Sequence, residues 1–145
     1  MRAQRYWDLK KKHEQEITDF PIAFAFNKEQ LKEALEKLGV DDISECCTVM
    51  EMGDIVKKTD ARDFVKMIDR HGEEIRALLN DRDLAFDIFV DEMDNHEYAI
   101  NWDGDDDILG CLSLNYDKLV EMNLVDVYNL ARREHYKHAE EWGMI

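Results

Sequence analysis

The residues of this sequence that could do chemistry are mostly carboxylates, and they are concentrated between residues 81 and 107. That segment holds eleven acidic residues and one basic residue, so it carries −10 of the formal net charge of −15. Such a field repels nucleic acids and anionic lipids and attracts cations or basic protein surfaces. Nine of the acidic residues are our candidates for binding a basic partner: Asp83, Asp87, Asp91, Asp94, Glu97, Asp103, Asp105, Asp106 and Asp107.

A calcium or magnesium site is one alternative use of these carboxylates. Asp103, Asp105 and Asp107 alternate as they do at the start of an EF-hand loop. That loop also needs glycine at its sixth position and glutamate at its twelfth. Ile108 and Leu114 occupy those positions, so the EF-hand pattern fails and a solvated acidic turn is the simpler interpretation.

Zinc is a second possibility, because His135 and His138 are three residues apart on a predicted helix. Structural zinc requires four ligands at defined spacing, and both histidines fall on the apolar stripe of that helix, so the sequence favours packed histidines. The cysteines Cys46, Cys47 and Cys111 are odd in number and include an adjacent pair, which is no disulfide framework. We therefore expect reduced thiols, no bound metal and no cofactor.

Acid–base catalysis is the remaining chemical alternative. The densest polar cluster comprises His96, Glu97, Asp94 and Tyr98. A histidine beside carboxylates can act as a general base. A metal-dependent or acid–base enzyme would be centred on His96, Glu97 and residues 103–107. Cys111 has no base partner that spacing identifies, and the sequence has neither a phosphate-binding glycine loop nor a G-x-S-x-G motif. The competing interpretation of residues 95–98 is a corner between a helix and a strand.

The elements that must position these residues follow from hydrophobic spacing. Helices are predicted over residues 4–18, 28–38, 60–79, 81–94, 107–112, 116–122 and 124–141. Short strands are predicted over residues 22–26, 47–52, 55–58 and 97–102, the middle two as a hairpin around Gly53 and Asp54. About six helices packed on a small, mostly antiparallel sheet of three or four strands make an α+β fold. The length predicts a single domain over residues 1–145.

Local signals refine two of these helices. Asn27 with Gln30 predicts a capping box, Gly39 predicts the end of the same helix, and Gly72 could kink or split the next one.

In the helix over residues 81–94 the apolar residues point inward. We expect its outer face to carry four like charges that repel one another: Asp83, Asp87, Asp91 and Asp94.

Composition excludes several classes of protein. Aromatic residues make up 10% of the chain, which argues against disorder. No apolar run approaches the roughly 18 residues of a membrane span, and no signal peptide is visible, so we expect a cytoplasmic protein without membrane contact. Residues 1–20 contain the basic run at 10–12 but carry a net charge of +1, so we expect no direct binding to nucleic acid.

Four strings of the sequence resemble a function-unknown family of small acidic proteins encoded by Firmicutes, their phages and their plasmids. The strings are residues 6–8 (YWD), 20–26 (FPIAFAF), 57–61 (KKTDA) and 95–98 (NHEY). The resemblance covers roughly residues 4–100, and the segment from Trp102 onward departs from it. It carries over no catalytic residue. It implies a mobile-element setting, in which small acidic proteins often inhibit host defence, some of them as DNA mimics.

Three hypotheses result. The first is a non-enzymatic acidic binding protein that inhibits a host-defence protein, such as a CRISPR effector or a restriction enzyme. It would imitate DNA and occupy the basic nucleic-acid channel of its partner. The second is the enzyme centred on His96, Glu97 and residues 103–107. The third is a housekeeping accessory protein that forms homodimers or larger homo-oligomers and whose acidity maintains solubility.

Overall fold

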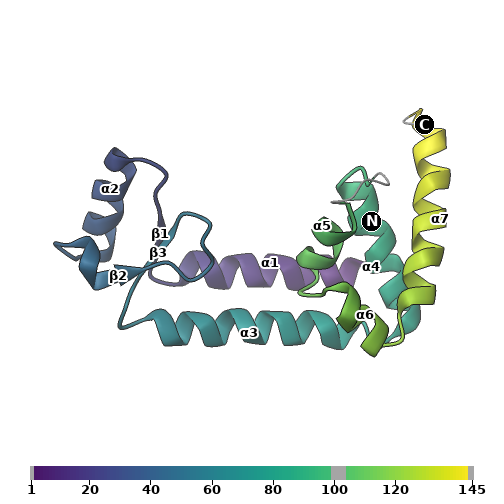
Figure 1. The fold of residues 1–145 in the computed structure, drawn as a ribbon, viewed down its shortest axis with the longest axis horizontal. Helices are drawn as coiled ribbons and strands as arrows, with labels where there is room; N and C mark the ends of the chain where they lie inside the picture. The colour runs from purple at the N-terminus through teal and green to yellow at the C-terminus, as the bar shows by residue number, and fades with distance from the viewer. Residues whose placement is uncertain (1, 99–103, 144–145) are drawn as a thin grey trace. The chain divides into compact units, whose positions relative to one another are not determined.

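The computed structural model describes residues 2–98 and 104–143, which fall into two compact units (Figure 1). The first unit comprises the residues up to Leu9 and those from Gly72 onward, and the second comprises Lys10–His71. Over the described residues the chain forms seven α-helices, one short 3-10 helix and a three-stranded antiparallel sheet. This confirms the α+β class, whereas the single domain stays a prediction. None of the described helices is long and apolar enough to cross a membrane.

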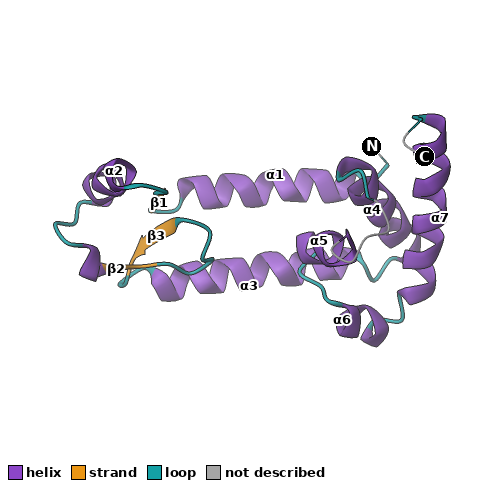
Figure 2. Cartoon of the chain, turned by 45° about the horizontal axis from the view of Figure 1, so that its top comes forward, coloured by secondary structure: helices purple, strands orange, loops and turns teal. Residues whose placement is uncertain are grey.

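The second unit is built on the sheet, whose strands pair in the order β1, β3, β2 (Figure 2). Its elements are β1 (Ile22–Phe24), α2 (Lys28–Leu38), the 3-10 helix η1 (Ile43–Glu45), β2 (Cys46–Cys47) and β3 (Asp54–Lys57). Val56 on the central strand stands opposite Ile22 on one side and Cys47 on the other. Side chains alternate between the faces of a strand. Ile22 and Val56 therefore enter one apolar cluster, while Ala23 and Ile55 enter a second cluster with α2.

α2 begins after Asn27 and ends at Gly39 as the sequence predicts, but the capping box forms only in part, because the Gln30 side chain bonds to the N–H of Phe26 and not to that of Asn27. The side chain of Asn27 accepts a hydrogen bond from the N–H of Gln30, and the Gln30 amide oxygen accepts one from the N–H of Phe26. Gly39 ends the helix in the left-handed region at φ 71°, which costs glycine little because it has no Cβ.

The predicted hairpin also forms, but with shorter strands than residues 47–52 and 55–58. β2 pairs with β3, and residues 48–53 form a loop around the buried carboxylate of Asp54. This carboxylate accepts hydrogen bonds from the N–H groups of Val49, Met50 and Met52 and from the Thr48 hydroxyl. Those N–H groups cannot then join a β-ladder. Burial alone would raise the pKa of Asp54, but the four hydrogen bonds lower it to about 2.

The first unit is helical and is organised around α4. Besides parts of α1 (Gln4–Asp19) and α3 (Ala61–Leu78), which contribute residues to both units, it contains α4 (Arg82–Asn95), α5 (Gly104–Cys111), α6 (Tyr116–Glu121) and α7 (Val125–Glu141). α4 begins at Asp81, whose side chain accepts a hydrogen bond from the N–H of Leu84. It packs against α7, and Ile88, Phe89 and Met93 are fully buried. Burial of each such side chain stabilises the folded state by roughly 1.5–3 kcal/mol.

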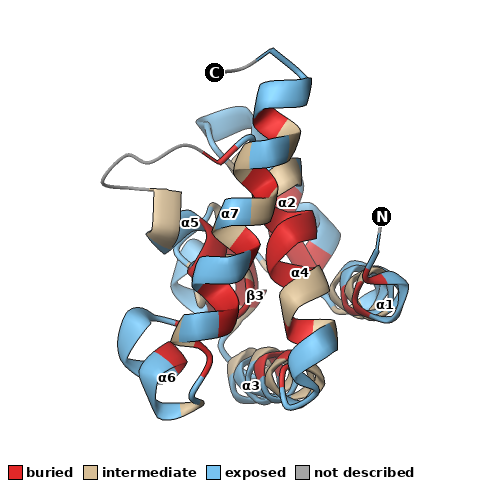
Figure 3. Cartoon of the chain, turned by 90° about the vertical axis from the view of Figure 1, so that its right-hand side faces the viewer, coloured by how far each residue is buried: buried red, intermediate tan, exposed pale blue. Residues whose placement is uncertain are grey.

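The prediction of an outer acidic face on α4 is wrong at the centre of the helix. Residues 88–93 are all buried, and Figure 3 shows α4 as mostly red. Asp91 is 5% exposed and Glu92 is 1% exposed. The reason is that α7 packs on α4 while the start of α1 is bonded to the same helix through the carboxylate of Asp91. Asp83 remains exposed and Asp87 is half-buried.

The structure departs from three further predictions. Glu97 lies in a turn and Tyr98 has no regular secondary structure, so neither is in the predicted strand. The remainder of that strand, residues 99–102, lies outside the described residues. Residues 104–107 form the first turn of α5 and not a separate turn. α3 continues unbroken through Gly72, where a Cβ would meet Ser113 Oγ at 3.2 Å, so this glycine allows close packing within the first unit.

Candidate metal centre

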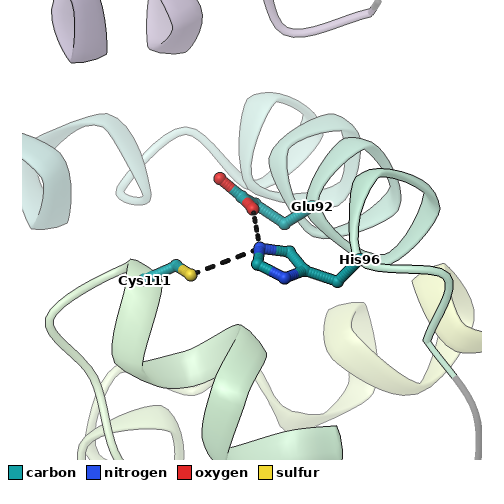
Figure 4. Close-up of side chains that lie close together, drawn as sticks. All are labelled: Glu92, His96 and Cys111. Carbon is teal, nitrogen blue, oxygen red and sulfur yellow. Dashed lines mark hydrogen bonds and ion pairs between the residues drawn. The ribbon is translucent and has the colours of Figure 1, made fainter.

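Three side chains of different chemical kinds converge in the first unit: Glu92, His96 and Cys111 (Figure 4). Glu92 and His96 are four residues apart, so they share one face of α4, and Cys111 is the last residue of α5. Nε2 of His96 lies 3.0 Å from Oε2 of Glu92 and 3.4 Å from Sγ of Cys111. All three donor atoms lie within 4.8 Å of one another. In a tetrahedral zinc site, bonds of ~2.0–2.3 Å place neighbouring ligand atoms roughly 3.2–3.8 Å apart.

The C-terminal end of α4 fixes the position of His96. The N–H of Tyr98 bonds to the carbonyl of Met93 at 2.9 Å, and the N–H of Glu97 bonds to the carbonyl of Asp94 at 3.3 Å. This pair of bonds is a Schellman motif, with Glu97 in the left-handed position at φ 49°. The helix therefore ends at Asn95 with His96 as its C-cap, and the imidazole lies one turn beyond Glu92.

The three donors differ in their exposure. Glu92 is almost fully buried, Cys111 is half-buried, and the side chain of His96 is 38% exposed. The cluster therefore has a protein-lined side at the carboxylate and a solvent-facing side at the imidazole. Among the described residues, Oε2 of Glu92 is a buried atom without a regular hydrogen bond, and its close polar neighbour is Nε2 of His96 at 3.0 Å. A buried carboxylate oxygen in that state costs free energy unless a cation compensates it.

The other oxygen of Glu92 is held by Tyr6 of α1. The Tyr6 hydroxyl donates to Oε1 at 2.5 Å, and the whole side chain of Tyr6 is buried. Burial, followed by the hydrogen bond to Glu92, raises the pKa of Tyr6 far above its usual range. The hydroxyl therefore keeps its proton and remains a donor to the carboxylate.

Nε2 of His96 cannot serve both of its neighbours by hydrogen bonding alone. A ring nitrogen presents either one hydrogen or one lone pair. With a hydrogen, it can donate to the oxygen of Glu92 or to the sulfur of Cys111, but not fully to both. With a lone pair, it can accept from the thiol of Cys111 but then faces a carboxylate oxygen. A divalent cation between the three atoms would satisfy all of them.

The carboxylate of Asp91, next to this cluster, is used inside the protein. It accepts hydrogen bonds from the N–H groups of Arg2 and Ala3 at 3.1 and 2.8 Å and from the indole N–H of Trp7 at 2.9 Å. These donors lie at the start of α1, where unpaired N–H groups and the helix dipole favour an anion. Asp91 therefore anchors the N-terminal segment and is not displayed to a partner.

Asp94 is similarly engaged. Its two oxygens lie 2.7 Å from Nδ1 of His135 and 2.9 Å from Nδ1 of His138. Nε2 of His135 lies 2.7 Å from the carbonyl oxygen of Tyr98. The expectation of packed histidines on the last helix is thus confirmed for His135, which is fully buried, while His138 is partly exposed.

The first turn of α5 holds one carboxylate with several partners in the protein and two exposed carboxylates. Asp105 accepts hydrogen bonds from the hydroxyls of Tyr98 and Tyr128 at 2.7 and 2.6 Å and pairs with Arg132 at 3.2 Å. Asp106 and Asp107 are exposed. Among the nine candidates, Asp83 and Glu97 are exposed as well, and Asp103 lies outside the described residues.

The polar cluster on which the alternative enzyme hypothesis was centred does not assemble around His96. The other members of that polar cluster, Asp94 and Tyr98, turn to His135 and to Asp105. The partner of His96 is instead Cys111, for which the sequence indicated no base. The signal that could have found the site is the i, i+4 pair of glutamate and histidine on α4. The cysteine is 15 residues further along the chain, on another helix.

Comparison with known protein families matches residues 5–134 to the model of a family of unknown function (DUF7659). The match extends past residue 100, where the resemblance noted in the sequence ended, and it spans Tyr6 and the three donor residues. No curated protein and no solved structure matches the chain.

Proposed function

The chain belongs to this family of unknown function, and we propose that it is a metal-binding protein that holds one zinc-class divalent cation between Glu92, His96 and Cys111. The observation that carries the proposal is the convergence of a carboxylate oxygen, an imidazole nitrogen and a sulfur within 4.8 Å of one another. This mixed set suits zinc and its neighbours in the first transition row, whereas calcium and magnesium prefer oxygen ligands alone.

The charges of the site support a divalent ion. A carboxylate and a thiolate supply two negative charges, which a neutral imidazole leaves unchanged, so the cation would be neutralised by its own ligands. The formal net charge of −15 also raises the local concentration of cations near the protein. Three protein ligands leave a fourth position for water or another ligand, which is the arrangement of exchangeable and catalytic zinc sites.

A cysteine–histidine nucleophile fits the geometry less well. In such a site the histidine contacts the nucleophile through one ring nitrogen and an orienting group through the other. Here the carboxylate of Glu92 and the sulfur of Cys111 both approach Nε2 of His96. In the described part of the chain, no carboxylate pairs with its Nδ1. This convergence on one atom favours a shared cation.

The full chain is purified with reduced thiols and stripped of metal. It is then titrated with zinc, followed by calorimetry, and with cobalt(II), followed by absorption spectroscopy. We expect one equivalent to bind, with a thiolate-to-cobalt charge-transfer band, and calcium and magnesium to give no heat. Cys111→Ser should abolish the band and His96→Ala should weaken binding. Cys47→Ser is the matched control, because Cys47 is also a half-buried cysteine but lies outside the site. A wild-type chain that binds neither ion, or a Cys111→Ser variant that binds like the wild type, would contradict the proposal.

A second role, binding of a basic protein surface, is favoured by the exposed carboxylates Asp83, Glu97, Asp106 and Asp107. None of these four forms an ion pair with another described residue. We propose them as the residues that contact the basic channel of a nucleic-acid-binding defence protein, in which the chain acts as a DNA mimic. The role of Asp87, which is half-buried, and of Asp103 in this contact stays a prediction.

This second role is tested by capture of partners from a lysate at low and high salt. Neutralising the four exposed carboxylates to amides should abolish capture of a salt-sensitive nucleic-acid enzyme. The matched control neutralises four exposed acidic residues of the second unit: Glu29, Glu33, Glu36 and Asp41. Equal loss in both variants would indicate a general charge effect, and capture of the chain alone would favour a homo-oligomer.

A further inference from the structure

We propose that Tyr6 couples cation binding at Glu92, His96 and Cys111 to docking of the N-terminal segment, residues 2–7, on α4. The inference rests on the proposed metal site and adds its regulation: the site is complete when this segment is docked, and an occupied site holds the segment in place. Tyr6 would be a positioning residue, because it touches a ligand of the cation and not the cation itself.

Two adjacent carboxylates of α4 receive the segment. Asp91 accepts hydrogen bonds from the backbone N–H groups of Arg2 and Ala3 and from the Trp7 indole, and Glu92 accepts one from the Tyr6 hydroxyl. The segment and α4 belong to the same compact unit. Ala3 and Tyr6 are fully buried in its apolar core. One short stretch of chain is thus fixed by apolar packing and by four hydrogen bonds to two consecutive residues.

Glu92 connects this docking to the cluster of donors because its two oxygens have different partners. Oε1 is bonded to Tyr6, and Oε2 lies 3.0 Å from Nε2 of His96. The Tyr6 bond therefore sets the rotation of the carboxylate and directs Oε2 to the point where the donors converge. Residues that orient a metal ligand in this way typically change metal affinity by 10–100-fold.

The coupling must act in both directions. If docking of residues 2–7 raises the affinity for the cation, the cation must raise the stability of the docked segment by the same factor. Binding of zinc should therefore slow hydrogen exchange of the backbone amides near the start of α1. Without the Tyr6 hydroxyl, the cation and the segment would lose this connection although both could still form their other contacts.

The experiment compares the full-length wild type with Tyr6→Phe and Tyr128→Phe. Tyr128 is a matched control because it is also buried and its hydroxyl also donates to a carboxylate, that of Asp105 at 2.6 Å, which is not one of the three donor residues. Zinc affinity is measured by competition with a chromophoric chelator, and hydrogen exchange of peptides from residues 2–9 is followed with and without zinc. We expect Tyr6→Phe to weaken zinc binding 10–100-fold and to remove the zinc-dependent protection. We expect Tyr128→Phe to preserve both.

The outcomes separate this inference from the metal proposal. If the wild type binds no zinc, both are overturned. If it binds zinc and Tyr6→Phe binds equally well, or if both tyrosine variants lose affinity alike, the coupling through Tyr6 is overturned while the metal site stands. If circular dichroism shows that Tyr6→Phe does not fold, the test rests on hydrogen exchange of the wild type with and without zinc. Unchanged exchange of residues 2–9 on zinc addition would then refute the coupling.

Discussion

The buried His135 and the partly buried Asp94 form a pair in which Nδ1 of the imidazole lies 2.7 Å from a carboxylate oxygen. The other ring nitrogen of His135 faces the carbonyl oxygen of Tyr98, also at 2.7 Å, and a carbonyl can only accept. Nε2 therefore carries a hydrogen. Nδ1 and Asp94 must share a second hydrogen, and this hydrogen ties α7 to the end of α4. The pair contributes to the position of residues 94–98, which follow Glu92 and include His96.

Replacement of Asp94 by alanine should destabilise the first unit strongly. It would leave Nδ1 of the buried His135 without an acceptor, and it would remove the partner of His138 at 2.9 Å. We expect the free energy of unfolding in urea to fall by about 2–4 kcal/mol. Glu140→Ala, at an exposed position of the same helix as His135, should change it by less than about 0.5 kcal/mol. Similar small effects of both variants would contradict the role assigned to Asp94.

Asp91 and Asp87 should respond differently to the same isosteric change. Asp91→Asn would place an amide nitrogen against the donors Arg2 N–H, Ala3 N–H and Trp7 Nε1–H. We expect a loss of about 2–3 kcal/mol in the free energy of unfolding. Asp87→Asn, one turn earlier on α4 and half-buried, should cost less than about 0.5 kcal/mol. Urea titrations of the two variants would measure the contrast, and equal losses would argue against a structural anchor at Asp91.

The second unit should lose stability in acid through Asp54. The folded pKa of about 2 lies below the ordinary value of 3.8, so the charged carboxylate stabilises the fold above pH 4. That stabilisation, about 2 kcal/mol, is lost as the pH falls from about 4 to about 2. Asp54→Asn should already lack it at neutral pH and should lose less stability over that interval than the wild type does. Parallel acid profiles of the two chains, measured by denaturant unfolding, would refute this account.

Glu97 should be a position where glycine stabilises the fold. Its φ of 49° is in the left-handed region, which a residue with a Cβ adopts at a cost and glycine adopts freely. We expect Glu97→Gly to raise the free energy of unfolding by about 0.5 kcal/mol, after the greater chain entropy of glycine is subtracted. Glu73→Gly, inside α3, should instead lower it by about 1 kcal/mol. A loss of stability on Glu97→Gly would indicate that the glutamate side chain makes a contribution that its exposed position does not suggest.

Features of the fold that depend on neighbouring residues could be predicted from the sequence. Asn27 and Gly39 limit α2 because a cap needs residues three or four positions apart. The hairpin was predicted with strands that were too long, since the sequence does not reveal that the carboxylate of Asp54 takes the N–H groups of its own loop.

The metal cluster could not be predicted because it depends on long-range packing. Spacing placed the acidic residues of α4 on an outer face, but periodicity assumes that a helix has a solvent side. The donors that bury Asp91 come from the other end of the chain, 88 and 89 positions away. Likewise, Cys111 reaches His96 through the packing of α5 against α4, which is not encoded in any local motif.

The unequal burial of the acidic residues of α4 has a consequence for sequence variation. Asp91 and Glu92 carry the same charge as Asp83, but they should tolerate substitution as poorly as the leucines of a core. In a saturation mutagenesis map read by protein abundance, positions 91 and 92 should accept almost nothing, while position 83 accepts most polar residues. Net charge could then drift widely among relatives of this chain while these two carboxylates stay fixed.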